Sequence, residues 1–219
     1  ASAPAAGAEA PDRQLLWGDT HVHTLNSTDA YESGTSNADI DTAYRFARGF
    51  PVIHPRTRTE VRIDRPLDFM VVADHAEMLS VFTRLRDRDP AVLASEGGRK
   101  LLDLFQQGAG KALSALVKMG AGDADEAIVR DLNAAPIRQS AWEAQIEAAE
   151  RHNRPGEFTA LIGWEWSSTP GGLNLHRVVF TPADGQTARR FLPLANYDTM
   201  RPEELWRFLE QTRARTGAD

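Results

Sequence analysis

The chain has 219 residues, 42% of them hydrophobic, so it can bury a core as one domain or as part of a larger one. Its net charge of −6 and the lack of any basic block argue against nucleic-acid binding. No apolar run is long enough to span a membrane. The absence of cysteine excludes disulfides and thiolate chemistry, so any bound metal must have nitrogen and oxygen ligands.

The chain begins with a stretch rich in Ala, Pro and Gly, which predicts a flexible tether over residues 1–14. Ala1-Ser2-Ala3 is typical of a mature exported protein after signal cleavage and predicts a periplasmic or secreted location. An ordinary flexible N-terminus is the alternative. The folded domain is then expected over residues 15–219.

The first predicted strand starts at Leu15 and ends in a His-x-His motif. Residues i and i+2 of a strand point to the same face, so His21 and His23 can direct both imidazoles at one point, as a metal ion requires. The alternative is a pair of histidines on a loop that binds no ligand.

The middle of the chain alternates between strand and helix patterns. Residues 67–73 form a continuous apolar run, which is typical of a buried parallel strand, and this run ends in Asp74-His75. The other expected elements before residue 90 are a polar loop over 27–30, helices over 38–48 and 77–88, and a hairpin of short strands at 52–53 and 60–63.

Residues 90–133 have a different pattern from the rest of the chain. Their helical segments are interrupted repeatedly by glycines. We expect a helical insertion or lid at about 90–133, outside the path of the sheet.

The second half of the chain resumes the alternation. A helix is expected over 136–152, a strand over 158–166 that carries Glu165 between two tryptophans, and a further strand over 173–180 that contains His176. This order predicts an α/β fold with a mostly parallel sheet or barrel. A final helix over 202–215 ends at a glycine with no strand after it, so we expect a further C-terminal part of the same protein as a partner.

Three predicted strands thus end in residue types that bind metals. Parallel strands bring their carboxyl ends to one face, so residues far apart in the sequence are expected to converge there. Several divalent ions close together need carboxylates to offset their charge, and Glu165 is the obvious candidate to bridge two of them.

The motifs that carry these residues resemble those of a known family. Residues 17–24 read Trp-Gly-Asp-Thr-His-Val-His-Thr, residues 73–77 read Ala-Asp-His-Ala-Glu and residues 163–166 read Gly-Trp-Glu-Trp. Together they resemble the PHP (polymerase and histidinol phosphatase) superfamily, and in particular its DUF3604 branch. The resemblance implies a distorted (β/α)7 PHP-type barrel, of which residues 15–219 are the N-terminal part. It also implies two or three bound metal ions and phosphoesterase activity.

The resemblance further implies a role for each matching residue. Glu165 would bridge two metals, and Asp29 would complete the first ligand motif. The histidines that would bind metal are His21, His23, His75 and His176. The family pattern continues with another His and an Asp-x-His, which this chain lacks, and this departure agrees with a missing C-terminal part.

The function predicted from these features is hydrolysis of a small-molecule ester, with a metal-bridging hydroxide as nucleophile and Mn, Zn or Fe as the divalent metal ions. Glu165 and Asp29 are the expected catalytic groups. Arg177 is a candidate to clamp a substrate oxyanion, although a surface or packing role is open for it. Asp19 and Asp74 could orient imidazoles, or Asp74 could cap the following helix.

Two alternatives remain open at this point. An amidohydrolase-like enzyme also uses His-x-His but adds a metal-bridging lysine, and the only lysines here, Lys100, Lys111 and Lys118, fall in the predicted insertion. Another ester hydrolase, or a non-catalytic metal-binding domain, would also fit the ligand pattern.

Overall fold

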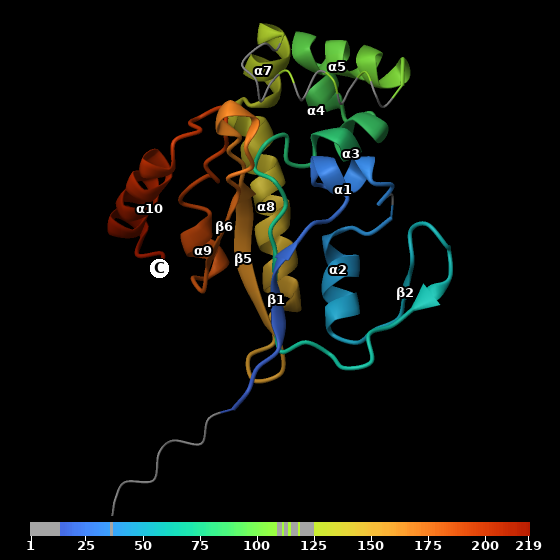
Figure 1. The fold of residues 1–219 in the computed structure, drawn as a ribbon, viewed down its shortest axis with the longest axis vertical. Helices are drawn as coiled ribbons and strands as arrows, with labels where there is room; N and C mark the ends of the chain where they lie inside the picture. Colours follow the sequence, from blue (N-terminus) through green and yellow to red (C-terminus); the bar gives the residue numbers. More distant parts are fainter. Residues whose placement is uncertain (1–13, 36, 109–110, 112–113, 115–117, 119–124) are drawn as a thin grey trace, which may run out of the picture.

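The computed structural model describes residues 14–35, 37–108, 111, 114, 118 and 125–219. The predicted tether over 1–14 lies outside these residues except for Gln14. The chain folds around a four-stranded sheet in the order β1 (Gly18–Val22), β4 (Phe69–Val72), β5 (Thr159–Trp166) and β6 (Arg177–Thr181). β1, β4 and β5 are parallel, whereas β6 is antiparallel to β5. The expected α/β class is confirmed as a mixed, mostly parallel half-barrel sheet interleaved with helices (Figure 1).

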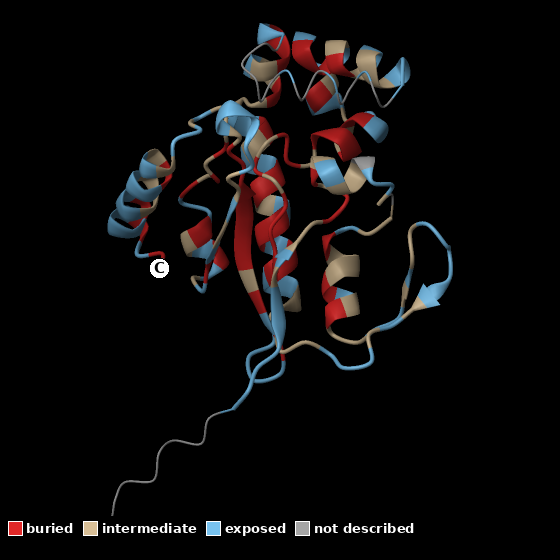
Figure 2. Cartoon of the chain, viewed as in Figure 1, coloured by how far each residue is buried: buried red, intermediate tan, exposed pale blue. Residues whose placement is uncertain are grey.

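One face of the sheet is covered by α8 (Ala135–His152) and α2 (Ile40–Ala47). The core between them contains Trp142 of α8 against Trp164 of β5, with ring centroids 5.8 Å apart. Gln145, which is buried on α8, donates from Nε2 to the carbonyl oxygens of Val72 at 2.9 Å and Gly163 at 2.5 Å. Figure 2 shows that β5 is buried along most of its length. The central strands are therefore fixed from one side by apolar packing and by a buried side-chain amide.

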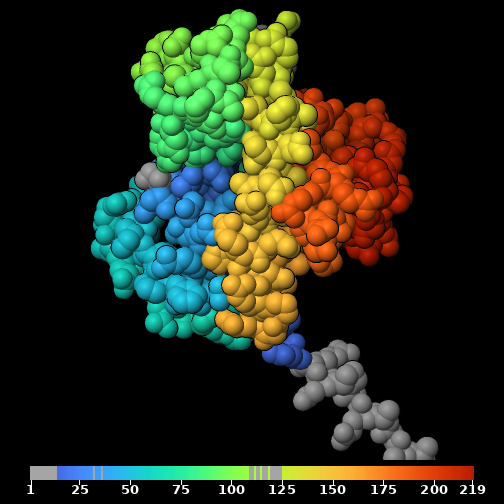
Figure 3. Space-filling view, turned by 180° about the vertical axis from the view of Figure 1, so that it is seen from behind, coloured from blue at the N-terminus to red at the C-terminus, as the bar shows by residue number. Residues whose placement is uncertain are grey.

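A group of helices lies beyond the carboxyl ends of the parallel strands. It consists of α3 (Val81–Arg86), α4 (Pro90–Leu93), α5 (Glu96–Gln106) and α7 (Glu126–Leu132), which share a separate apolar cluster with the start of α8. Figure 3 shows this group stacked on one end of the molecule, with α8 running down between the N-terminal and C-terminal segments. The described residues within 90–133 contain helices and no strand. Residues 109–110, 112–113, 115–117 and 119–124 lie outside the description, so the extent of the predicted insertion stays a prediction.

The remaining elements flank these two parts. A hairpin of β2 (Val52–Ile53) and β3 (Glu60–Val61) lies beside α2, as expected. The short helix α9 (Gly185–Ala188) packs on α8, and α10 (Pro202–Thr216) ends at Gly217 in a left-handed conformation. Among the residues that the structure describes, every helix is too short or too polar to cross a lipid bilayer.

Three predicted boundaries are wrong. The helix expected over 77–88 is the shorter α3, because Met78, Ser80 and Arg88 have left-handed backbones. The loop expected over 27–30 is the start of a helix, α1 (Thr28–Glu32). The strand expected over 173–180 begins only at Arg177, because Pro170–Gly172 forms a 3-10 turn whose glycines have positive φ and the chain stays irregular up to His176. His176 therefore precedes β6, and the antiparallel direction of β6 brings it to the end of the sheet where β5 finishes.

Gly163 lies at a close packing contact within the sheet, which leads to a stability prediction. A Cβ at this position would lie 2.5 Å from Val71 Cγ1 and 2.7 Å from the carbonyl oxygen of Val179. Because one of these neighbours is backbone, Gly163→Ala should lower the free energy of unfolding by about 1–3 kcal/mol, as overpacking does. Urea denaturation followed by far-UV circular dichroism measures this change.

The matched control for Gly163→Ala is Thr159→Ala, at an exposed position of the same strand. This control should change the unfolding free energy by less than about 0.5 kcal/mol. Equal stabilities of Gly163→Ala and the wild type would contradict the packing described for β5.

Candidate metal centre

The candidate site lies where β1, β4 and β5 end and β6 begins, at the end of the sheet nearest α1 and α3 (Figure 1). His23 and His75 follow the last residues of β1 and β4, and Glu165 lies near the end of β5. The β4–β5 ladder continues past Val72, since Glu165 N donates to Asp74 O at 3.0 Å and Ala76 N donates to Glu165 O at 2.9 Å. This extension places His75 directly beside Glu165.

Glu165 is the centre of the site, and four imidazoles surround its carboxylate. Its side chain is only 2% exposed. The surrounding nitrogens are His21 Nε2 at 3.1 Å, His23 Nε2 at 2.8 Å and His75 Nδ1 at 3.4 Å from Oε2, and His176 Nδ1 at 3.1 Å from Oε1.

These separations fit a shared metal ligand set. Two ligand atoms that each lie about 2.1 Å from one metal ion, at tetrahedral or octahedral angles, are about 3.0–3.4 Å apart. Glu165 Oε2 and His23 Nε2 are both buried and lie 2.8 Å apart, but neither atom is aligned for a hydrogen bond with the other or with another group. A buried acceptor and a buried imidazole nitrogen left unpaired carry a desolvation cost that a cation between them would remove. The residues present therefore fit a divalent metal.

The ligand atoms form three overlapping groups that could each hold an ion, with all atoms of a group within 4.8 Å of one another. Glu165 belongs to two groups, one with His21 and His23 and one with His75 and His176. The third group joins His23 and His75 to Asp29. All six residues predicted as ligands are thus brought together, although neither the number of ions nor their identity follows from this geometry.

Asp29 lies on the open side of the site, with 54% of its side chain exposed. Its two oxygens lie 3.0 and 2.9 Å from His23 Nδ1, and Oδ1 also accepts a hydrogen bond from Ser27 Oγ at 2.7 Å. An imidazole whose Nδ1 is hydrogen-bonded to a carboxylate presents Nε2 to a metal. Asp29 is therefore placed to orient His23, and its predicted role as a ligand stays a prediction.

The charges at the site are strongly coupled. Burial opposes protonation of His23, but the carboxylates of Asp29 and Glu165 outweigh it and raise the pKa of His23 to about 10. Burial raises the pKa of both carboxyl groups. The imidazoles outweigh this effect and hold the pKa of Asp29 and of Glu165 well below the ordinary range. Burial lowers the pKa of His75 to about 4, because Glu165 offsets only part of it. The metal-free site therefore keeps a proton on His23 beside two ionised carboxylates.

Three polar side chains at the site had no assigned role in the sequence analysis. Ser27 Oγ accepts a hydrogen bond from His75 N at 3.2 Å, in addition to binding Asp29. Ser167 Oγ lies 2.5 Å from His75 Nδ1 and donates to Glu77 Oε2 at 2.7 Å. Glu77 falls inside a quoted motif, Ser27 follows His23 in the loop expected over 27–30, and Ser167 directly follows β5, so position relative to the strand ends was the available signal.

The proposed orienting roles of Asp19 and Asp74 are wrong. Asp19 Oδ1 accepts from the backbone N of His21 at 2.9 Å, next to a register shift between β1 and β4, and does not reach an imidazole. Asp74 is fully buried and accepts from Thr24 N and Thr24 Oγ1. It neither caps a helix nor contacts a histidine ring, and instead ties the end of β4 to the chain that follows β1.

Arg177 is exposed, and its Nη1 donates to the carbonyl oxygen of His176 at 2.7 Å. This contact places it beside the site without directing it at the ligands. His54 lies apart from these ligands, since its Nδ1 accepts from the backbone N of Thr57 at 3.1 Å within the β2–β3 turn.

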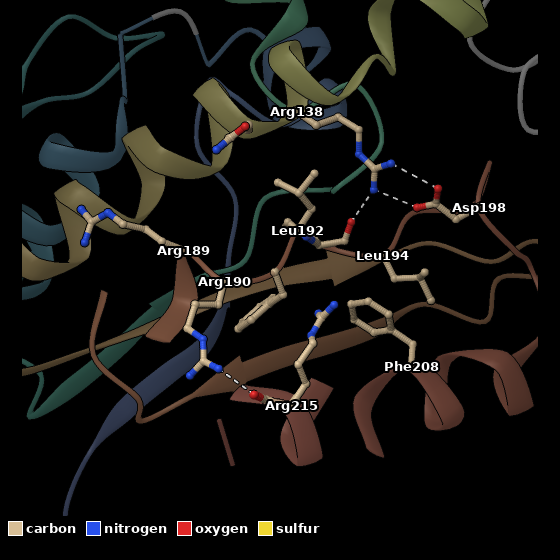
Figure 4. A pocket seen from close by; sticks show the side chains of 11 residues that line it. Arg138, Arg189, Arg190, Leu192, Leu194, Asp198, Phe208 and Arg215 are labelled. Atoms are coloured by element: carbon tan, nitrogen blue, oxygen red, sulfur yellow. Dashed lines mark hydrogen bonds and ion pairs between the residues drawn. The ribbon is translucent and has the colours of Figure 1, made fainter. Parts of the chain in front are cut away.

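A separate pocket lies away from these ligands. It has a volume of about 460 Å³ and is lined by α8, by α10 and by the segment around residues 189–198. Figure 4 shows Arg215 pointing into it beside Phe208, with Arg138 paired to Asp198 at its rim. None of the predicted ligands lines this pocket.

Comparison with known families supports the DUF3604 resemblance inferred from the quoted motifs. Residues 10–219 match the family described as "Protein of unknown function (DUF3604)". Since the match spans nearly all of the chain, the chain belongs to this family. We find no match among curated proteins and none among solved structures.

The raised pKa of His23 generates a prediction for metal uptake. A metal that binds His23 Nε2 must displace the proton that this ring keeps below about pH 10. Affinity should therefore rise with pH, and uptake should still release about one proton at about pH 8.5, where an ordinary histidine is already neutral. Calorimetric titration with Mn²⁺ in two buffers of different ionisation enthalpy measures this release.

The control for proton release is Asp29→Asn, which removes one carboxylate beside His23. Release at about pH 8.5 should fall toward zero in this variant, because the pKa of His23 would drop. Uptake without proton release in the wild type would show that His23 is not displaced by the metal.

Proposed function

We propose that this DUF3604 chain is the metal-binding part of a hydrolase that acts on phosphate esters. In this proposal the half-barrel belongs to a distorted (β/α)7 barrel of PHP type, and the site holds two or three divalent ions such as Mn, Zn or Fe. The observation that supports it most directly is the buried Glu165 carboxylate among four imidazoles, with no aligned hydrogen bond to its Oε2.

The residues that would hold the ions follow from the three groups at the site. Glu165 is shared by two of them, so its two oxygens would serve two neighbouring ions and offset part of their mutual repulsion. When bound, such ions lower the pKa of water and stabilise negative charge that develops on the substrate. The protein contributes the fixed positions of the imidazoles and Glu165, and it excludes water from the floor of the site.

Charge balance favours a phosphate ester over a neutral substrate. Two divalent ions bring four positive charges, and Asp29 with Glu165 offsets two of them. The loaded site therefore keeps a positive charge that would attract an anionic phosphoryl group. We place Arg177 at the rim as an additional contact for such an oxyanion, as its exposed guanidinium has further donors.

Access to the site favours catalysis over a purely structural metal. The Glu165 side chain is 2% exposed, whereas His21 is 51% exposed and Asp29 is 54% exposed. Structural metal sites are closed, whereas catalytic sites keep an open coordination position. One buried side and one open side match the second kind of site, so a non-catalytic role is the weaker alternative.

An amidohydrolase-like reaction is also less well supported than hydrolysis of a phosphate ester. Lys100 Nζ pairs with Glu96 at 2.9 Å and with Asp125 at 3.0 Å, within the helical group. Lys111 and Lys118 are exposed. None of the three is positioned to bridge metals at the ends of β4 and β5.

Glu165→Gln tests the proposed function. The amide keeps the size of the side chain but loses the charge that two cations would share, so we expect the loss of at least one ion per chain. Turnover should fall by about 100-fold or more, as for other groups that stabilise charge in a transition state. Metal content by atomic emission and hydrolysis of chromogenic phosphate mono- and diesters provide the two readings.

His54→Ala is the matched control, since it removes an imidazole from an exposed turn away from the site. It should retain both metal content and turnover. A Glu165→Gln protein with normal metal content and full activity would end the proposal.

A further inference from the structure

We infer that Glu77 and Ser167 position His75 so that it offers Nε2, and not Nδ1, to a metal ion. This inference rests on the proposed metal-binding function and adds two positioning residues to it. Neither residue belongs to the ligand groups.

The direction of the hydrogen bonds carries the inference. Ser167 Oγ lies 2.5 Å from His75 Nδ1 and 2.7 Å from Glu77 Oε2. A hydroxyl has one proton, and Ser167 donates it to Glu77, whose other oxygen already accepts from two backbone N–H groups. The remaining contact is satisfied when His75 Nδ1–H donates to the Ser167 oxygen. His75 Nε2 is then unprotonated and free to bind a cation.

Glu77 is held so that this direction is maintained. Its other oxygen, Oε1, accepts from Asn196 N at 2.6 Å and from Ser167 N at 3.3 Å. The carboxylate thus receives two backbone donors and one hydroxyl, and its side chain is only 13% exposed. Three donors around the Glu77 carboxylate fix its orientation toward Ser167.

The loop after His75 is built to bring Glu77 back toward β5. Met78 and Ser80 both have left-handed backbones, with φ of 56° and 61°. Left-handed conformations are costly for residues other than glycine and persist where the surroundings fix them. Met78 is buried in the apolar cluster of the helical group, and Ser80 N donates to Asn26 O at 2.9 Å. These contacts maintain the turn that places Glu77 under Ser167.

The arrangement distinguishes between the two ligand groups that include His75. Its Nε2 lies 3.8 Å from Asp29 Oδ2, on the side of the group with His23 and Asp29. The group with Glu165 and His176 would need Nδ1, which lies 3.4 Å from Glu165 Oε2 and is already in contact with Ser167. We therefore assign His75 to the ion beside Asp29, which leaves His21 and His23 at Oε2 of Glu165 and His176 at Oε1.

Ser167→Ala tests this assignment, with Ser168→Ala as the matched control. Ser168 is the next residue and is also buried, but its Oγ donates to Met200 O at 2.6 Å and not to a histidine. The tautomer of His75 is read from ¹H–¹⁵N correlation spectra of histidine-labelled, metal-free protein at about pH 8, where the His75 ring is neutral. Calorimetry gives the affinity for Mn²⁺.

We expect the wild type and Ser168→Ala to show His75 protonated on Nδ1, and Ser167→Ala to lose this preference. Ser167→Ala should weaken Mn²⁺ binding by about 10- to 100-fold, whereas Ser168→Ala should stay within about twofold. Glu77→Gln provides a second variant, since its amide would donate to Ser167 and favour the opposite tautomer. It should weaken binding to a similar degree.

A wild-type His75 protonated on Nε2, or a Ser167→Ala protein with wild-type affinity, would overturn the assignment. Failure of the proposed function is distinguishable from this result. A wild type that binds no divalent ion would refute the metal-binding proposal, while the tautomer of His75 in the metal-free protein would still decide the role of Ser167 and Glu77.

Discussion

The buried carboxylate of Glu165 is the constraint on which the site depends. An ionised carboxylate that loses its water needs compensating charge or hydrogen bonds, or it destabilises the fold. Here four imidazoles from β1 and from the segments next to the ends of β1, β4 and β6 converge on it, and one of its oxygens has no aligned hydrogen bond. The ends of four strands are thereby held around one charged group whose full satisfaction requires a cation.

The sheet supplies the positions. The parallel strands β1, β4 and β5 end on the same side of the sheet, and the antiparallel strand β6 begins on that side. Gln145 and the tryptophans of α8 and β5 fix the face of the sheet that packs on α8. The ligands therefore lie on or next to strands that are held in place. The polar residues around the ligands then select ring nitrogens: Asp29 occupies His23 Nδ1, and Ser167 occupies His75 Nδ1. Strand order and hydrogen-bond direction together define which atoms face a metal.

The sequence alone predicted the alternation of strands and helices and the residues that converge, because hydrophobic period and strand-end position are local signals. It did not predict that the chain around His176 is irregular, since the 3-10 turn at Pro170–Gly172 depends on glycine backbones with positive φ. It also missed the roles of Asp19, Asp74 and Glu77. The sequence does not indicate whether a carboxylate beside a ligand accepts from an imidazole, a hydroxyl or a backbone N–H. The partner is set by tertiary contacts, here those of Thr24, Ser167 and Asn196.

The central claim, that Glu165 and His23 share a metal ion, is tested most directly by an anomalous-diffraction experiment on crystals grown with Mn²⁺ or Zn²⁺. The account predicts a strong anomalous peak about 2.0–2.3 Å from both His23 Nε2 and Glu165 Oε2. The claim would be contradicted by a structure in which metal ions fully occupy other sites, no peak lies between these two atoms, and a direct hydrogen bond joins them.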